Sequence, residues 1–301
     1  MFLKLAKRIV QIPLAVQTYM TLRYIFSMTD DFARKMLGKK PVLYLLEYHI
    51  ADHCNMNCKG CYHFSCLVKS ESFPQLQHYR RDIQRLAALF ANIKTIHLMG
   101  GEPLLNNELP GFIRETRAAF PAAKICILTN GILYKKIEGE LLEAIKLCDV
   151  LVQVSLYKPM IPRKDEMRAY FLNQGIKHWI GEPVLYFAKY INPAGDSDPV
   201  KTSRQCPASR CTFLGDGHIA RCALPFNIGY FNRHFGLDIP AQQDKTDIHS
   251  GDSDGFALKR KLLRPMPLCK YCRRLKWAAW EPAACKPAAG GAHNIEDFCH
   301  I

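Results

Sequence analysis

From residue 41 to about residue 157, short apolar runs alternate with segments that have the periodicity of helices. The first run, Val42–Ile50, is almost continuously apolar, which is typical of a strand buried on both faces of a parallel sheet. Alternation of this kind predicts an α/β fold whose parallel sheet is either open or closed into a barrel. Further strands are expected at Ile93–Met99, Lys124–Thr129, Val150–Tyr157 and within 176–190, and helices at 80–91, 110–119 and 136–147.

The chain has 301 residues, which is long enough for one large domain and a small module. Turn-rich sequence at 194–205 marks a boundary, and seven of the 13 cysteines lie beyond residue 200. We therefore divide the chain into a basic amphipathic segment (1–40), a βα region (41–195) and a cysteine-rich module (196–301).

Three cysteines, Cys54, Cys58 and Cys61, come directly after the first predicted strand. Their C-x3-C-x2-C spacing supplies three thiolates and no fourth, whereas a closed structural metal site takes four ligands. Three ligands suit an iron–sulfur cluster with one iron left open for a small molecule. The clustering of the cysteines favours metal binding in a reducing compartment over disulfides, so a cytoplasmic location is expected.

A second motif, Gly100-Gly101-Glu102-Pro103, follows the next predicted strand. The two glycines lack Cβ atoms and let the backbone approach a ligand closely, and Glu102 offers a carboxylate to a ligand ammonium group. Both motifs fall at the carboxyl ends of predicted parallel strands, where ligands bind in such folds.

Together the two motifs resemble those of the radical S-adenosylmethionine superfamily, and the resemblance spans roughly residues 42–190. It implies a partial (β/α)6 TIM-type barrel over 41–195, with a 4Fe–4S cluster on the three cysteines. It also implies that S-adenosylmethionine (SAM) is bound at Gly100–Pro103 and cleaved reductively to a 5′-deoxyadenosyl radical, which abstracts hydrogen from a substrate. Asn130 and Ser155, at the ends of later strands, resemble further cofactor-contacting positions more weakly.

One position departs from that family. An aromatic residue usually precedes the third cysteine and lies against adenine, but Gly60 occupies this position here. Tyr62 or His63 is expected to take its place.

The cysteines beyond residue 200 form a second pattern. Gly217 stands five residues before Cys222, and a C-x2-C pair follows after a gap of 46 residues. This pattern resembles the auxiliary-cluster module called twitch, the short form of the SPASM domain. Ala278 stands where a longer module would continue with cysteine, so one auxiliary 4Fe–4S cluster is expected. The implied ligands are Cys222, Cys269, Cys272 and either Cys206 or Cys211.

Two separated cysteine pairs also suit tetrahedral zinc, which is the alternative for this module. Among the remaining cysteines, Cys66, Cys285 and Cys299 are candidate hydrogen-atom donors to a substrate radical. Cys126 and Cys148 are expected to be buried core thiols.

The expected activity is dehydrogenation or epimerisation of a small polar substrate, sugar-like or phosphorylated, by an enzyme of the oxidoreductase or epimerase type. One alternative is a maturase for a ribosomally made peptide, although residues 1–40 are too short for a leader-binding domain. Another is a non-enzymatic iron–sulfur or zinc protein, against which the intact Gly-Gly-Glu-Pro motif argues.

The formal net charge of +14 favours an anionic partner. An acidic electron donor such as flavodoxin or ferredoxin would suit the cations around 259–274. Residues 1–28 are basic and amphipathic, which indicates either a helix packed on the domain or contact with the inner face of an anionic membrane. No nucleic-acid-binding module is recognised, so nucleic acid is not an expected partner.

Overall fold

The computed structural model describes residues 29–206, 208, 211–251, 254–283 and 293–299. The predicted membrane-contact segment 1–28 and the candidate donor Cys285 lie outside the described residues. Within the described part, no helix is both long enough and apolar enough to cross a bilayer.

The main sheet has eight strands in the order β5-β4-β3-β2-β1-β7-β8-β9. Neighbouring strands from β5 to β7 are parallel, and β8 and β9 continue the sheet antiparallel. The strands are β1 (Val42–Ala51), β2 (Asn92–Gly100), β3 (Lys124–Thr129), β4 (Leu151–Val154), β5 (His178–Ile180), β7 (Thr212–Gly215), β8 (His218–Ala220) and β9 (Thr246–Asp247). This arrangement confirms the predicted α/β class and a partial barrel of the TIM type.

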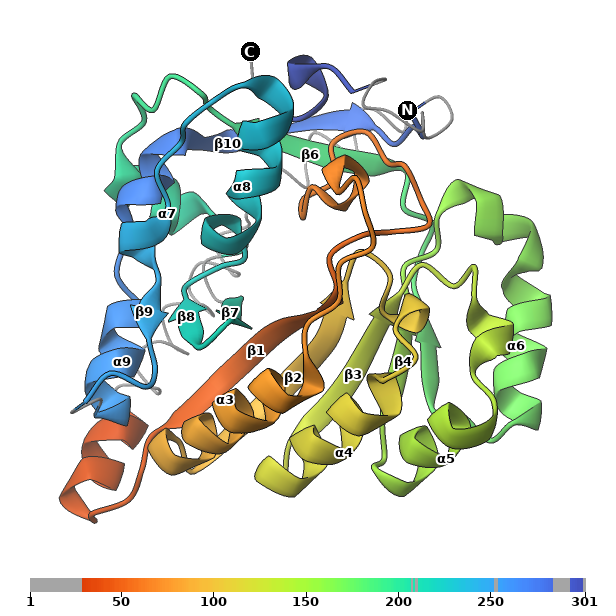
Figure 1. Ribbon diagram of the computed structural model, residues 1–301, viewed down its shortest axis with the longest axis horizontal. Coiled ribbons are helices and arrows are strands. Elements are labelled where there is room, and N and C mark those ends of the chain that lie inside the picture. Colours follow the sequence, from red (N-terminus) through yellow and green to blue (C-terminus); the bar gives the residue numbers. More distant parts are fainter. Residues whose placement is uncertain (1–28, 207, 209–210, 252–253, 284–292, 300–301) are drawn as a thin grey trace.

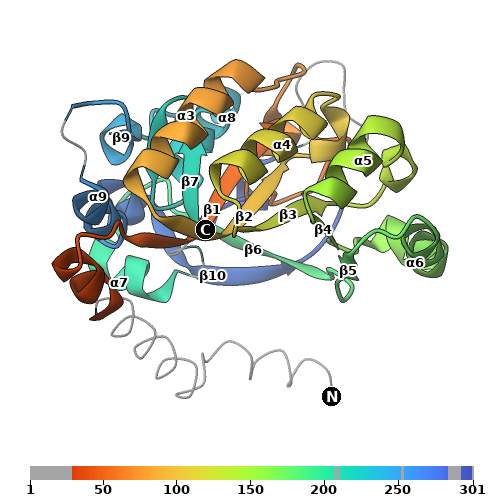
Figure 2. The ribbon, with the colours of Figure 1, turned by 90° about the horizontal axis from the view of Figure 1, so that it is seen from below.

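One face of the sheet is covered by the helices that connect the strands (Figure 2). Leu46, Tyr48 and Ile50 alternate along β1 and are all buried under this layer. The ring of Tyr48 lies 4.4 Å from that of Tyr79, measured between centroids. The covering helices are α3 (Leu76–Leu89), α4 (Leu109–Ala119), α5 (Gly139–Leu147) and α6 (Lys164–Asn173).

A two-stranded antiparallel ribbon lies near the carboxyl ends of the parallel strands (Figures 1 and 2). It pairs β6 (Tyr186–Ile191) with β10 (Cys272–Ala279). The last predicted strand of the 41–195 region therefore leaves the sheet. The sixth parallel strand is instead β7, which belongs to the segment 196–301 and pairs with β1 on the side away from β2. The two regions that the sequence separates thus share one sheet.

The C-terminal region builds a second apolar core against the cysteine loop. Phe64, next to that loop, packs its ring 5.2 Å from Phe231 and 5.6 Å from Phe298, measured between centroids. The helices of this region are α7 (Pro199–Gln205), α8 (Leu224–Phe235) and α9 (Gly255–Leu262). This core fixes the C-terminal region against the carboxyl end of β1.

The buried carboxylate of Asp82 on α3 also joins the two regions. Asp216 and Gly217 both have positive φ, 45° and 73°, and form the two-residue turn between β7 and β8. The backbone N–H of Gly217 donates to Oδ2 of Asp82 on α3 at 2.7 Å. Oδ1 of Asp82 lies 2.7 Å from Nε2 of His249. Asp82 is 1% exposed, so these bonds are formed away from water.

We expect Asp82→Ala to lower the free energy of unfolding by about 2 kcal/mol, because it leaves a buried N–H without an acceptor. Asp165→Ala is the matched control, since the Asp165 side chain is 92% exposed and pairs with Arg168 three residues away. The control should stay within about 0.5 kcal/mol of wild type. Denaturant unfolding measures both, and equal effects would contradict the role given to Asp82.

Candidate functional site

A cavity of about 250 Å³ opens at the carboxyl ends of β1 to β4. The loop after β1 supplies the three cysteines, and the turns after β2, β3 and β4 supply small and polar residues, as expected for a parallel sheet. Its lining residues are Cys54, Met56, Cys58, Cys61, Tyr62, His63, Ser65, Cys66, Met99, Gly100, Gly101, Leu128, Thr129, Asn130, Ser155, Tyr157 and Phe187. The structure therefore brings together most of the residues that the sequence proposed for the first site.

The three cysteines lie in a mostly dry environment. Burial raises the pKa of Cys54 and of Cys58 to about 12. A hydrogen bond from Cys66 is the main reason why the pKa of Cys61 is lowered to about 6. The first two side chains are therefore neutral thiols in the protein alone, and metal binding would have to displace their protons.

A buried donor without an acceptor lies beside the cysteines. Trp280 belongs to the same buried cluster as Cys54 and Cys58, and its Nε1 has no hydrogen-bond partner among the described residues. A buried N–H beside cysteines suits a site in which negatively charged sulfur accumulates, as in an iron–sulfur cluster.

Across the described residues, no three His, Cys, Asp or Glu side chains converge on a point where one metal ion could bind. A cluster of several irons and sulfides is wider than a single ion, and it accepts thiols spread around a cavity. Three cysteines around a cavity of this size, with an unpaired N–H donor beside them, fit a cluster.

The two glycines of the second motif let the end of β2 lie against the cysteine loop. A Cβ atom on Gly100 would lie 2.1 Å from the carbonyl oxygen of Ala51, and one on Gly101 would lie 2.1 Å from that of His53. Close approach also allows hydrogen bonds, because Gly101 N–H donates to the Ala51 carbonyl at 2.8 Å. The two glycines thus allow the end of β2 to contact the cysteine loop, and both also line the cavity.

Glu102 is fully buried and its carboxylate is engaged by the protein. It accepts from the Leu104 N–H at 3.1 Å, the Thr129 hydroxyl at 2.7 Å and the Asn130 N–H at 2.9 Å. Glu102 therefore ties the turn after β2, which Pro103 begins, to the end of β3. Neither Glu102 nor Pro103 lines the cavity, so a bond from Glu102 to a ligand ammonium stays a prediction.

Asn130 and Ser155 both line the cavity. The side-chain amide of Asn130 donates to Oδ1 of Asn55 at 2.7 Å and lies 3.7 Å from Sγ of Cys54. Asn130 therefore joins the end of β3 to the cysteine loop, as Glu102 joins it to the end of β2.

Gly60 has a structural reason to be glycine. Its φ is +70°, and a Cβ atom there would lie 3.0 Å from the carbonyl oxygen of Asp297. An aromatic residue at this position would be strained in its backbone and crowded by the C-terminal segment. Tyr62 and His63, the two predicted replacements, both line the cavity, and Nδ1 of His63 lies 2.9 Å from Nε2 of His49.

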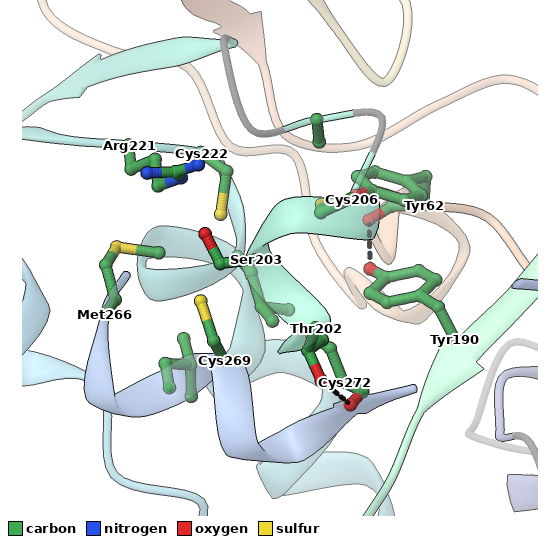
Figure 3. A pocket seen from close by; sticks show the side chains of 13 residues that line it. Tyr62, Tyr190, Thr202, Ser203, Cys206, Arg221, Cys222, Met266, Cys269 and Cys272 are labelled. Carbon is green, nitrogen blue, oxygen red and sulfur yellow. Dashed lines mark hydrogen bonds between the residues drawn. The ribbon is translucent and has the colours of Figure 1, made fainter. Parts of the chain in front are cut away.

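A second cavity lies between α7, the β8–α8 turn and the start of β10 (Figure 3). Four of the five cysteines predicted for the auxiliary site line it, namely Cys206, Cys222, Cys269 and Cys272. Cys211 does not line it and lies beside Glu47 of β1 instead. The structure thus groups Cys206, and not Cys211, with the other three.

The candidate hydrogen-atom donors separate clearly. Cys66 lines the first cavity beside Cys61. Cys299 is 2% exposed in the second core and lines neither cysteine cavity. Cys126 and Cys148 are buried, as expected of core thiols.

Residues 280–283 form a part of the site that sequence reasoning missed. The Lys59 N–H donates to the Glu281 carbonyl at 3.0 Å, and the Ala283 N–H donates to the Asn57 carbonyl at 2.7 Å. These bonds hold the C-terminal segment on the cysteine loop and place Trp280 beside the cavity. No local pattern links 280–283 with 54–61, so only the folded chain reveals the contact.

One predicted surface cation is also not at the surface. Lys259 is 4% exposed, and its ammonium group lies 2.7 Å from Oδ1 of Asp31. It is therefore not available to an acidic electron donor.

The model of a family described as a 4Fe-4S single cluster domain matches residues 45–176. The probable GTP 3′,8-cyclase of Metallosphaera sedula is 35% identical over 95 residues, which is 30% of this chain and 28% of that protein. The GTP 3′,8-cyclase of Clostridium acetobutylicum is 33% identical over 103 residues, which is 33% of this chain and 31% of that protein. The chain thus spans less than a third of the length of these two relatives.

Similar solved structures include BtrN in complex with AdoMet and 2-DOIA, with a TM-score of 0.46 and 18% identity, covering 77% of this chain and 94% of that one. They also include native anSMEcpe with bound AdoMet, with a TM-score of 0.38 and 18% identity, covering 46% of this chain and 43% of that one.

Burial raises the pKa of Glu102 from its ordinary 4.5 to about 7. Between these values the folded protein keeps a proton that the unfolded chain releases, so this group makes stability fall as the pH rises. Glu102→Gln cannot titrate. As the pH rises through this window, we therefore expect the unfolding free energy of wild type to fall relative to that of the variant, by up to about 3 kcal/mol. Denaturant titrations at several pH values measure it, and parallel profiles would contradict the shift.

Proposed function

Because the chain belongs to the radical S-adenosylmethionine superfamily, we propose that it is an enzyme that oxidises a small polar molecule after abstracting a hydrogen atom from it. The observation that carries this proposal is the second cysteine cavity, which lies next to the first and shares a lining residue with it. Removing hydrogen from a carbon leaves a substrate radical, and oxidation requires that one further electron be taken away. A cluster in the second cavity would be the acceptor within the same chain.

In the first cavity, Cys54, Cys58 and Cys61 would hold the 4Fe–4S cluster. When bound, that cluster supplies the electron that cleaves SAM to methionine and the 5′-deoxyadenosyl radical. Asn130 and Ser155 offer polar groups to the cofactor from the ends of β3 and β4.

In the C-terminal region, Cys206, Cys222, Cys269 and Cys272 would hold an auxiliary 4Fe–4S cluster in a twitch-like module. Burial raises the pKa of the Cys222 and Cys272 thiols well above the ordinary range, so these ligands would lose their protons only when metal binds. Four thiols close the coordination, which suits electron transfer better than the binding of a small molecule.

The lining of the first cavity favours an uncharged polar substrate over a phosphorylated one. Its described lining residues include tyrosine, histidine, serine and asparagine side chains, and neither lysine nor arginine. Hydroxyl groups of a sugar or polyol match such donors and acceptors, whereas a phosphate group would lack a cation. The curated relatives are named for a reaction of GTP, which supports a small molecule rather than a peptide.

Epimerisation is the second candidate, and Cys66 is the observation in its favour. Its thiol lines the first cavity and could return a hydrogen atom to a substrate radical. However, the same thiol is hydrogen-bonded to Cys61, one of the proposed cluster ligands. Oxidation therefore agrees better with the geometry, and hydrogen donation by Cys66 remains the alternative.

We expect the reconstituted, reduced protein to transfer deuterium from a deuterated sugar or polyol into 5′-deoxyadenosine, and to release a product that has lost two hydrogens. Mass spectrometry of the nucleoside and of the product measures both, with neutral and phosphorylated hexoses assayed side by side. A variant with alanine at Cys54, Cys58 and Cys61 is the control and should form no 5′-deoxyadenosine.

The assay repeated in D₂O with the unlabelled substrate separates the two reactions. Oxidation leaves no solvent deuterium on the attacked carbon, whereas epimerisation places one there, and Cys66→Ala should abolish that incorporation. Solvent deuterium at that carbon would contradict oxidation. A fully loaded wild-type protein that forms no 5′-deoxyadenosine would contradict the enzyme itself.

A further inference from the structure

Among the residues that the structure describes, Tyr62 is the one that lines both cysteine cavities. It follows Cys61 directly in the chain, so its backbone continues the first site. Figure 3 shows its side chain at the edge of the second cavity, near Cys206 and Tyr190. Tyr62 therefore borders both groups of thiols.

Two contacts with Tyr190 of β6 fix the position of Tyr62. The rings are stacked, with centroids 4.4 Å apart and an interplanar angle of 29°. The Tyr190 hydroxyl donates to the Tyr62 carbonyl at 3.0 Å. Tyr190 is 4% exposed and belongs to the second core, so Tyr62 is held by a rigid support.

Tyr62 and Cys206 both line the second cavity, and Figure 3 shows them next to each other. A tyrosine hydroxyl beside a cysteine is a hydrogen-bond donor that the sulfur can accept. Hydrogen bonds to a cysteine sulfur stabilise negative charge on a cluster, and they are one of the means by which proteins set cluster potentials.

We propose that Tyr62 is a positioning residue that couples the two cysteine sites. Its hydroxyl stabilises the reduced state of the auxiliary cluster through Cys206, and the residue borders both that cluster and the SAM cavity. The inference rests on the proposed two-cluster function and adds to it a residue that makes the auxiliary site the better electron acceptor. The electron that leaves a substrate radical is taken up by the oxidised auxiliary cluster, and no bond of Tyr62 is made or broken.

The test uses Tyr62→Phe, which removes the hydroxyl and keeps the ring on Tyr190. The full chain is reconstituted with iron and sulfide, and both clusters are titrated by electron paramagnetic resonance against a series of redox potentials, without SAM. We expect the equilibrium between the oxidised and reduced auxiliary cluster to shift about tenfold toward the oxidised form. For a one-electron couple this lowers the midpoint potential by about 59 mV. The midpoint of the cluster on Cys54, Cys58 and Cys61 should not change.

Tyr157→Phe is the matched control, since Tyr157 lines the first cavity but not the second. It should leave the auxiliary midpoint at the wild-type value. Iron analysis of each variant accompanies the titration, so that a lost cluster is not mistaken for a shifted one.

The outcomes separate this inference from the proposed function. Two clusters in wild type and an unchanged auxiliary midpoint in Tyr62→Phe would contradict the role of Tyr62 alone. Loss of auxiliary iron from Tyr62→Phe would also contradict it, because the residue would then only hold the site together. A wild-type protein with a single cluster would contradict the two-cluster function, and the inference with it.

Discussion

The parallel pairing of β1 on both of its sides is the constraint on which the rest of this structure depends. β1 bonds to β2 along most of its length and to β7 through its middle residues, Leu46–Tyr48. A strand in the middle of a sheet is fixed in register by two neighbours, and a shift by one residue would turn Leu46, Tyr48 and Ile50 away from the helices. The cysteine loop that follows β1 is therefore anchored before any cofactor binds.

Backbone and carboxylate bonds then assemble the ends of the neighbouring strands around that loop. Gly100 and Gly101 allow contact between the end of β2 and the loop, and Glu102 joins the ends of β2 and β3. From the opposite side, residues 280–283 bond to the loop and bring Trp280 beside Cys58. The cysteine loop that lines the first cavity is thus held in place by both halves of the chain.

The fold class could be predicted from the sequence because it depends on local signals. The apolar run of β1 and the helical periodicity after it are visible within short windows, and they place the first cysteines and Gly100–Pro103 at strand ends. The sixth parallel strand could not be predicted, because β7 is short and its pairing with β1 joins residues more than 160 positions apart. For the same reason the spacing of the cysteines could not decide whether Cys206 or Cys211 is the fourth ligand. In the folded chain Cys211 lies beside Glu47 of β1.

Anomalous X-ray diffraction at the iron edge, from crystals of the anaerobically reconstituted protein with SAM, tests the central claim most directly. The account predicts two compact iron sites, one held by Cys54, Cys58 and Cys61 with SAM on its open iron, and one held by Cys206, Cys222, Cys269 and Cys272. Iron in the first cavity alone, zinc in the second, or Cys211 as a ligand in place of Cys206 would contradict it.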